Sequence, residues 1–486
     1  MFLEEEEGEV WDLRSEFDLA PPPPPPPHRQ PKGVPACEAP FAEGEALLPE
    51  GLCVRRLVDP RMVSKRQELW YPRAIICSEE TGGDLLVLDR GRGGSPPRIL
   101  ALRDADGDGS IGADEFAVLL DSSEQFTGGA QVSGLNHGLA SQGGFLYASS
   151  DAKIWRWRYN PGQRERLGAA ELVIDEINRV GPPGPGGEPG APMGHKTRTL
   201  VFDNDGRLYV SVGSVSNWDG DSYRSRIRRF PGLSAVPEDG GRAAGWPIDF
   251  RKGEVFADGL RNEVGLAWQD SLRQVLWGVE NGGDNLEVPS LGGDIHQDNP
   301  AEELNRFPLD KPGRHYGYPW CFTEYLLPSQ FGGGRGAQWA TSSSEWPGKD
   351  NAFCKNPEDN VPPALSMQGH SAPLGLRFYG ADWANATEAC ENPPALPCKF
   401  LNSLFVSFHG SWNRDIPTGY KIVRIPFRDG LPLDGDPEDF LRHKGPEAQW
   451  PETNLRPVDV AFGPDSRLFV SAGMNGELLT IYRPGE

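Results

Sequence analysis

The chain lacks an excess of positive charge. Its 486 residues include 48 lysines and arginines against 70 aspartates and glutamates, for a formal net charge of −22. Nucleic acids and anionic membranes attract basic surfaces, so this balance argues against both as partners and favours a small neutral ligand. No apolar run approaches the roughly 20 residues that span a bilayer, so we expect no membrane span.

The acidic N-terminus also lacks the basic and apolar segments of a secretory signal. The cysteines nevertheless point to an oxidising compartment, because Cys321 with Cys354 and Cys390 with Cys398 form close pairs that fit disulfides. Reduced thiols of a cytosolic protein are the alternative. The sequon at Asn385 favours secretion, and we expect an extracellular protein whose signal is absent from this chain or already cleaved.

Little of the sequence favours helix, whereas 60 glycines and 47 prolines fall between strand-like runs, as in a turn-rich all-β protein. One strand-like signature, of the type Leu-Tyr-Val-Ser, recurs along the chain. It begins at Leu85, Leu146, Leu208, Leu276, Leu404 and Leu468. Such a repeat fits one four-stranded blade each and predicts an all-β, six-bladed β-propeller of antiparallel blades with long loop insertions.

The interval between the fourth and fifth signatures is about twice the others, and we place an insertion there from roughly Asn285 to Gln368. A seventh blade is possible in this stretch, but six is preferred because only six lead-in segments are visible. An Ile-x-Arg pattern follows the signature in most blades, at Ile154, Ile227, Ile422 and Ile481.

Residues 1–50 stand outside the repeat, because they are acidic and contain an uninterrupted proline run over residues 21–27. This composition predicts a disordered segment. Residues 51–486 are expected to form the propeller domain.

An apolar lead-in with a polar side chain precedes each signature by about ten residues. These side chains are Arg73, His137, His195, Arg261 with Asn262, His370 and Arg456. Equivalent positions of a propeller converge on the central channel, so the repeat predicts a site there. His195 is the favoured base, since a histidine accepts a proton near neutral pH; a hydrogen-bonded histidine that closes a blade is the alternative.

Arginines at the lead-ins suggest an anionic ligand. Arg261 offers a planar set of donors for carboxylate or quinone oxygens, and Asn262 can donate and accept beside it. Arg73 and Arg456 lie at the lead-ins of other blades. A surface salt bridge is the alternative role for Arg261. Aromatic residues near these positions would stack on a sugar or pack between blades: Trp218, Trp320, Trp412, Tyr318 and Tyr420.

The segment from Asp104 to Glu115 matches the calcium-loop pattern, with glycine at its sixth position. Its expected ligands are Asp104, Asp106, Asp108, Ser110 and Glu115. A strand-like run replaces the entering helix, so only half of an EF-hand is present. We expect a structural calcium here, with an acidic surface loop as the alternative.

Several motifs in one order resemble those of the soluble PQQ-dependent glucose, sorbosone and pyranose dehydrogenases, from about Gly51 to the C-terminus. They are Asn136-His137-Gly138-Leu139, Gly194-His195, Gly259-Leu260-Arg261-Asn262, Val279-Glu280-Asn281-Gly282-Gly283-Asp284, Glu303-Leu304-Asn305, His315-Tyr316-Gly317-Tyr318-Pro319-Trp320 and Leu455-Arg456-Pro457-Val458-Asp459. The run from His409 to Arg414 is similar to the sorbosone and pyranose branch.

This resemblance implies a propeller that holds pyrroloquinoline quinone (PQQ) and calcium at the top of its channel. His195 falls on the family's general base, which takes the proton of the anomeric hydroxyl while hydride passes to the quinone. Arg261 and Asn262 fall on contacts to cofactor and substrate, and the carbonyls of Gly282 and Gly283 on the ligands of the catalytic calcium, which acts as a Lewis acid.

The resemblance extends to Arg456, which matches an arginine on the cofactor, and to Asn136 and His370, which match rim positions lining substrate or cofactor. We also expect cofactor contacts at Arg73, His409 and Arg414, and substrate contacts at Asn136, His370, His137 and Trp218. The chain departs from the glucose branch at Val458, where that branch has a second cofactor arginine. It also lacks that branch's cofactor lysine, and only His409 or Arg414 lies nearby.

The expected activity is oxidation of an aldose or pyranose at C1, with electrons passed to an external acceptor, a quinone or a cytochrome, because no cytochrome domain is attached. The main alternative is a non-catalytic extracellular binding propeller of the same fold. A calcium-dependent, lactonase-like hydrolase is a third reading, and it would need several carboxylates converging in the channel.

Overall fold

A computed structural model describes most of the chain. The described residues are Cys37, 46–58, 67–124, 129–177, 194–220, 224–233, 245–341, 346–453, 455–474 and 476–485. The proline run and most of residues 1–50 lie outside them, as does the glycine- and proline-rich loop before His195. No helix in these ranges is long and apolar enough to cross a membrane.

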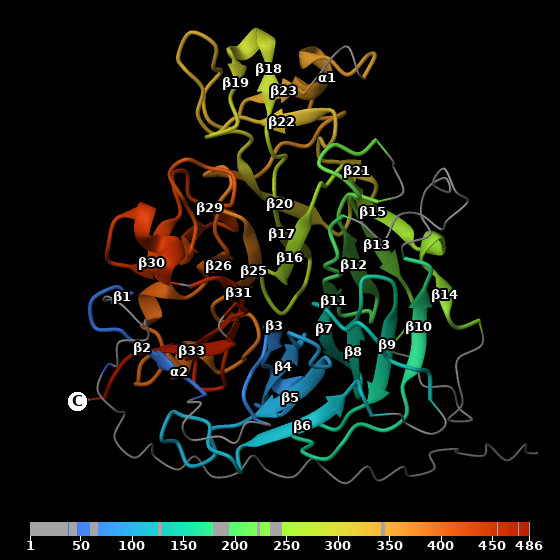
Figure 1. Ribbon diagram of the computed structural model, residues 1–486, viewed down its shortest axis with the longest axis vertical. Helices are drawn as coiled ribbons and strands as arrows, with labels where there is room; N and C mark the ends of the chain where they lie inside the picture. The colour runs from blue at the N-terminus through green and yellow to red at the C-terminus, as the bar shows by residue number, and fades with distance from the viewer. Residues whose placement is uncertain are drawn as a thin grey trace, which may run out of the picture.

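Six sheets of mainly antiparallel strands surround a central axis (Figure 1), which confirms the six-bladed β-propeller. The first blade contains β3 (Pro72–Ile76), β4 (Leu85–Asp89), β5 (Arg98–Leu102) and β6 (Phe116–Asp121). The second contains β7 (Leu139–Gln142), β8 (Phe145–Ser149), β9 (Ile154–Arg158), β10 (Glu171–Asp175) and β14 (Ile248–Asp249). The third contains β11 (Leu200–Phe202), β12 (Leu208–Val212), β13 (Arg226–Phe230), β15 (Glu254–Asp258) and β21 (Arg314–His315).

The remaining blades complete the ring. The fourth contains β16 (Glu263–Trp268), β17 (Val275–Glu280), β20 (Glu302–Pro308) and β24 (Leu365–Met367). The fifth contains β25 (Pro373–Phe378), β26 (Leu404–Phe408), β27 (Lys421–Ile425), β30 (Glu438–His443) and β1 (Ala46–Leu47). The sixth contains β31 (Pro457–Phe462), β32 (Leu468–Ala472), β33 (Glu477–Tyr482) and β2 (Cys53–Arg56).

The repeated signature forms the second strand of every blade: β4, β8, β12, β17, β26 and β32. These strands have sheet neighbours on both sides and other blades on both faces, and β4, β8, β12, β26 and β32 are buried along their whole length. Double-sided burial explains why they appear as continuous apolar runs rather than alternating patterns. The Ile-x-Arg pattern forms the third strands β9, β13, β27 and β33.

An N-terminal strand closes the ring. Strand β2 pairs antiparallel with β33, so residues from the two ends of the propeller share the sixth blade. Ala46 and Leu47 of β1, inside the segment expected to be disordered, pair with β30 of the fifth blade. Cys37 is bonded to Cys53 at the start of β2.

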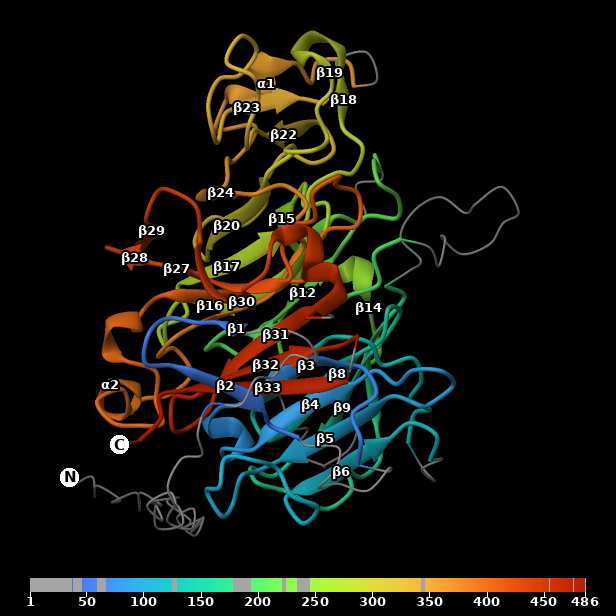
Figure 2. The same cartoon turned by 60° about the vertical axis from the view of Figure 1, so that its left-hand side comes forward.

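The insertion belongs to the fourth blade and is split into two parts. The hairpin of β18 (Glu287–Val288) and β19 (Gly293–Asp294) lies between β17 and β20. A second part, with β22 (Cys321–Thr323), β23 (Gln338–Ala340) and the short helix α1 (Asn351–Lys355), lies between β20 and β24. Both parts project beyond the ring (Figure 2). Treating residues 285–368 as one insertion was wrong, because β20 and β24 inside it are the outer strands of the blade.

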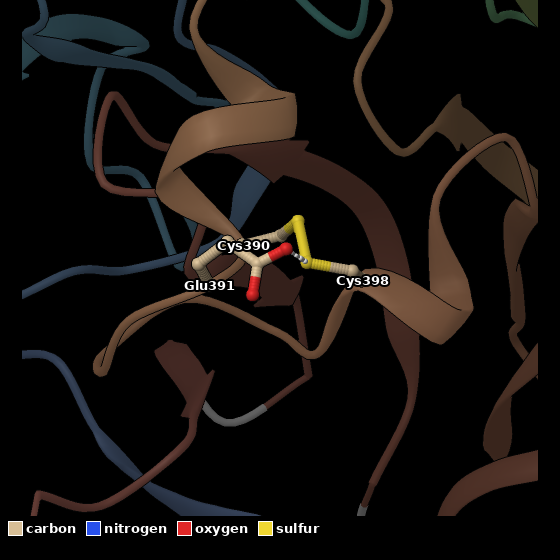
Figure 3. Close-up of side chains that lie close together, drawn as sticks. All are labelled: Cys390, Glu391 and Cys398. Carbon is tan, nitrogen blue, oxygen red and sulfur yellow. Dashed lines mark hydrogen bonds between the residues drawn. A yellow bond between two sulfur atoms is a disulfide. The ribbon is translucent and has the colours of Figure 1, made fainter.

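Both expected disulfides are present. Cys321 is bonded to Cys354, which ties β22 to α1. Cys390, which follows the short helix α2 (Ala386–Ala389), is bonded to Cys398, with the carboxylate of Glu391 beside the pair (Figure 3). The two sulfurs bond each other, so this cluster offers no thiolate pair for a metal.

Candidate active site

The lead-in side chains lie where the inner strands begin. Arg73 is in β3, and the other lead-ins directly precede β7, β11, β16, β25 and β31. Because the inner strands contact one another around the ring, these positions share one end of the channel. At the other end, the channel widens into a cavity of 610 Å³ that reaches up to His137 and Asp459.

His195 is held as a neutral imidazole. Its Nδ1 lies 3.0 Å from Oγ of Ser214 and 3.2 Å from the Ser214 carbonyl. The Ser214 hydroxyl donates its own proton to the carbonyl of Ser216, so both neighbours of Nδ1 are acceptors. The proton therefore sits on Nδ1, and Nε2 keeps a lone pair. Burial, with the positive charge of Arg261, lowers the pKa of His195 to about 3.

Gly213 lets His195 and Asn262 come together. A Cβ at this glycine would lie 2.7 Å from Cβ of His195 and 2.6 Å from Oδ1 of Asn262, so any larger residue would push them apart. The Oδ1 of Asn262 is buried and has no hydrogen-bond partner in the described part of the chain. An unpaired buried acceptor is costly, so it marks a position where a ligand donor would be stabilising.

Arg261 is fixed by the turn that follows β17. Its Nη2 donates to Oδ1 of Asn217 and pairs with Oδ2 of Asp284, both at 2.9 Å, and its Nη1 donates to the Gly282 carbonyl at 2.5 Å. Its backbone N–H donates to the carboxylate of Glu280. Arg261 is therefore already charge-neutralised by Asp284.

Two partners in this network were absent from the expected site residues. Asn217 accepts from Arg261 and from the backbone N–H of Asp284, and it donates to the Asp284 carbonyl. Asp284 follows the expected calcium turn Gly282-Gly283, so its position in that motif was the available signal. Nothing in the sequence around Asn217 identifies its role.

His370 joins the same side of the channel. Its Nδ1 lies 3.7 Å from Oδ1 of Asp284, and its Nε2 donates to the His296 carbonyl at 2.5 Å. Burial lowers the pKa of His370. The structure thus brings together His195, Asn262, Arg261, Asp284 and His370 on the third to fifth blades.

Arg73 and His137 form a second group. Arg73 Nη2 donates to Nδ1 of His137 at 3.3 Å, and Arg73 Nε is buried without a partner. Burial lowers the pKa of Arg73 to about 10 and that of His137 well below its usual value. Among the described residues, no carboxylate lies within ion-pair distance of Arg73.

His409 and Arg456 complete this group. Nδ1 of His409 donates to the Pro457 carbonyl at 3.1 Å, and burial, with the charge of Arg73, lowers its pKa to about 3. Arg456 donates to the Tyr420 hydroxyl at 2.9 Å, and its guanidinium lies 4.7 Å from that ring's centre. Arg456 also has no carboxylate partner in the described part of the chain, so Arg73 and Arg456 are the uncompensated cations here.

Other expected residues make contacts within the protein. Arg414 is paired with Asp298 at 2.9 Å. Trp218 stacks on Tyr318 with ring centres 5.9 Å apart and covers Gly283. Asn136 donates to the Lys196 carbonyl at 3.0 Å, which links the second and third lead-ins.

The position at which the resemblance to the glucose branch led us to expect a second arginine is apolar. Val458 is fully buried and clusters with Val264 and Leu374, which lie on neighbouring inner strands. These three apolar side chains pack against one another, so this position offers no cation to a ligand.

A buried acidic cluster lies behind Arg261. Glu263, Glu280 and Glu303 each place an oxygen 3.2–3.4 Å from Nδ2 of Asn305. Burial raises the pKa of all three carboxyls, that of Glu303 to about 7. They lie on β16, β17 and β20, and Glu280 supports the backbone of Arg261.

The Asp104 loop is remote from these groups. Inner strands start at the lead-in end and blade strands alternate in direction, so the connection between β5 and β6 lies at the opposite end. Its carboxylates therefore take no part in the candidate active site.

The chain is similar to known proteins over most of its length. The chain is 28% identical over 441 residues to the pyrroloquinoline quinone-dependent sugar dehydrogenase of Hypocrea jecorina, covering 86% of each protein. It is 27% identical over 446 residues to the pyrroloquinoline quinone-dependent pyranose dehydrogenase of Coprinopsis cinerea, covering 85% of this chain and 52% of that protein. The chain thus spans about half the length of the Coprinopsis relative.

Two solved structures are similar over nearly the whole chain. A calcium structure of a Trichoderma reesei protein of carbohydrate-active enzyme family AA12 has a TM-score of 0.69 and 27% identity, covering 93% of this chain and 100% of that one. The holo form of the PQQ domain of Coprinopsis cinerea pyranose dehydrogenase has a TM-score of 0.68 and 25% identity, covering 92% and 99%. The TrAA12-like family profile matches residues 61–484, and the chain belongs to this family.

Proposed function

We propose that the protein oxidises an aldose or pyranose at C1, with pyrroloquinoline quinone bound at the lead-in end of the channel. The observation that carries this proposal is the neutral imidazole of His195, whose Nε2 lone pair remains available. The relatives named as pyrroloquinoline quinone-dependent sugar and pyranose dehydrogenases support the same substrate class and cofactor.

The residues present fit the cofactor. Pyrroloquinoline quinone carries three carboxylates, and Arg73 and Arg456 are cations without carboxylate partners among the described residues. Binding the anion would satisfy the buried Nε of Arg73. When bound, the quinone supplies the two-electron acceptor for hydride from C1.

The proton is handled by the protein. Nε2 of His195 takes the proton of the anomeric hydroxyl as the C1–H bond breaks, and the sugar leaves as a lactone. The Nδ1–H group remains hydrogen-bonded to Ser214, which fixes the ring plane during proton transfer. Asn262 beside it binds ligand oxygen or nitrogen donors through its unpartnered Oδ1.

We propose that calcium binds at the turn from Gly282 to Asp284, which supplies carbonyl and carboxylate oxygens of the class that this cation prefers. Arg261 already donates to the Gly282 carbonyl, so it would share that oxygen with the metal. An external quinone or cytochrome is proposed to collect the electrons. The disulfides favour secretion.

A non-catalytic binding propeller is the second candidate, because Val458 replaces one expected cation. Reconstitution separates the two. Protein loaded with pyrroloquinoline quinone and calcium should reduce a redox dye when sugars are added. Saturable cofactor binding without dye reduction across a broad sugar panel would favour the binding protein.

A further inference from the structure

The loop between β5 and β6 gathers three carboxylates at the end of the ring remote from the active site. Asp104, Asp106 and Asp108 each offer an oxygen, and these oxygens lie within 4.8 Å of one another. Glu115 braces the loop, because its Oε1 accepts the backbone N–H of Ala105 and its Oε2 accepts that of Gly112. The spacing of the three aspartate oxygens is compatible with a single cation bound by oxygen ligands only.

Asp104 supplies an independent sign of a missing ligand. Its side chain is only 6% exposed, and one oxygen, Oδ2, pairs with Arg467 at 3.0 Å. The other oxygen, Oδ1, is buried without a hydrogen-bond partner among the described residues. A buried carboxylate oxygen with no partner is strongly destabilising unless a cation or donor reaches it. Burial also raises the pKa of Asp104.

The same loop contacts the strand that closes the propeller. Arg55 of β2 donates through Nη2 to the Asp108 carbonyl and to Oγ of Ser110, both at 2.9 Å. The backbone N–H of Ile111 donates to the Leu57 carbonyl at 2.8 Å, just after β2. Arg467, which holds Asp104, precedes β32 of the sixth blade. The loop of the first blade therefore contacts the sixth blade at two places, at β2 and at the start of β32.

We propose that Asp104, Asp106 and Asp108 bind one Ca²⁺ ion that latches the sixth blade, with β2, onto the first. The ion satisfies Oδ1 of Asp104 and removes the repulsion among the three carboxylates. It orders the Asp108 carbonyl and the Ser110 hydroxyl that accept hydrogen bonds from Arg55, so ring closure becomes calcium-dependent. This latch is separate from the calcium proposed at Gly282–Asp284 and needs neither cofactor nor sugar.

The test uses the whole chain, stripped with EGTA and free of pyrroloquinoline quinone. Bound calcium is counted by equilibrium dialysis, and the thermal midpoint and the amide deuterium exchange of β2 are measured with and without Ca²⁺. The variant Asp106→Asn/Asp108→Asn changes two carboxylates that form no ion pair within the described residues. Asp114→Asn is the matched control in the same loop, and Asp284→Asn removes a carboxylate of the other proposed site.

We expect wild type and Asp114→Asn to bind one calcium more per chain than the double variant, and Asp284→Asn to keep the calcium of the Asp104 loop whatever happens at the other site. In those three proteins Ca²⁺ should raise the midpoint by several degrees and slow exchange in β2 at least tenfold. Equal calcium counts in wild type and the double variant would overturn the site. Loss of one calcium with unchanged exchange in β2 would overturn the latch.

Discussion

Nδ1 of His195 lies 3.0 Å from Oγ of Ser214, and that hydroxyl itself donates a hydrogen bond to the Ser216 carbonyl. This relay of donors fixes the imidazole tautomer without a carboxylate. A carboxylate at this place would raise the pKa of His195, whereas burial and Arg261 lower it to about 3. The imidazole is therefore kept neutral at near-neutral pH.

Replacing His195 tests its role directly. His195→Gln should lower kcat by at least about a hundredfold, because general-base transfer accounts for roughly 10²–10⁴ in rate and glutamine accepts no proton. Cofactor affinity should change little, since Arg73 and Arg456 remain. The measurement is dye reduction by the loaded variant beside an absorption titration with pyrroloquinoline quinone. Turnover within tenfold of wild type would assign the base elsewhere.

The lowered pKa of His195 also predicts a pH effect on stability. The folded histidine has a pKa of about 3 against an ordinary value of 6.5, so only the unfolded chain is protonated between these values. The free energy of unfolding therefore falls as pH drops through this window, by up to about 1.4 kcal/mol per pH unit for this one proton.

The His195→Gln variant removes that proton. Its unfolding free energy is measured by urea titration between pH 4 and pH 6. The slope of this free energy against pH should be smaller than that of wild type, by the contribution of about one bound proton. Parallel slopes for the two proteins would mean that folded His195 titrates normally.

The fold was predictable because the second strand of each blade is buried on both faces. Signatures such as Leu208–Ser211 therefore stand out as apolar runs at a fixed interval. Strand β20 was not recognised as the fourth blade's third strand, because its Glu302, Glu303 and Asn305 carry a buried polar cluster rather than an apolar run. Polar residues in a strand mask the repeat.

The site was predictable in position but not in pairing. Lead-ins are fixed by the repeat, so His195, Arg261 and Asn262 could be placed at the channel. The partners of Arg261 come from loops of different blades, and no periodicity links Asn217 to residue 261. Whether a carboxylate neutralises Arg261, or none of the described residues does so for Arg73, depends on those long-range contacts.

The uncompensated arginines should dominate cofactor affinity. Arg73→Met and Arg456→Met should each weaken pyrroloquinoline quinone binding by at least tenfold, because each removes a charge-assisted contact worth about 1.5–3 kcal/mol. Arg424→Met is the control, since Arg424 pairs with Glu438 on the outer strands of the fifth blade. The measurement is an absorption or calorimetric titration. Equal losses in all three variants would contradict a specific role at the channel.

Asn217 should act by positioning Arg261. Asn217→Ala removes its contacts to the guanidinium of Arg261 and to the backbone of Asp284, so kcat should fall about tenfold while the fold persists. Asn217→Asp, which keeps the acceptor, should recover part of the loss. Steady-state kinetics with the loaded enzyme should give kcat values that fall from wild type to Asn217→Asp to Asn217→Ala. Identical kinetics for Asn217→Ala and wild type would show that Asn217 does not position Arg261.

The disulfide between Cys321 and Cys354 should stabilise the insertion. It closes a segment with a sequence separation of 33 residues, for which loop-closure entropy predicts about 3–4 kcal/mol. Cys354→Ser should expose residues 321–354 to limited proteolysis while the blades stay resistant. Cys77→Ser, which changes the buried free thiol of the first blade, is the comparison. Unchanged cleavage of the insertion would show that packing alone holds it.

The central claim is sugar oxidation by a bound quinone with His195 as base. Its most direct test is the absorption spectrum of the anaerobic protein, loaded with pyrroloquinoline quinone and calcium, as aldoses and pyranoses are added one at a time. We predict that at least one sugar converts the bound cofactor to its reduced spectrum within seconds in wild type, and that His195→Gln keeps the oxidised spectrum. An oxidised spectrum that no sugar changes in wild type, with the cofactor demonstrably bound, would contradict the account.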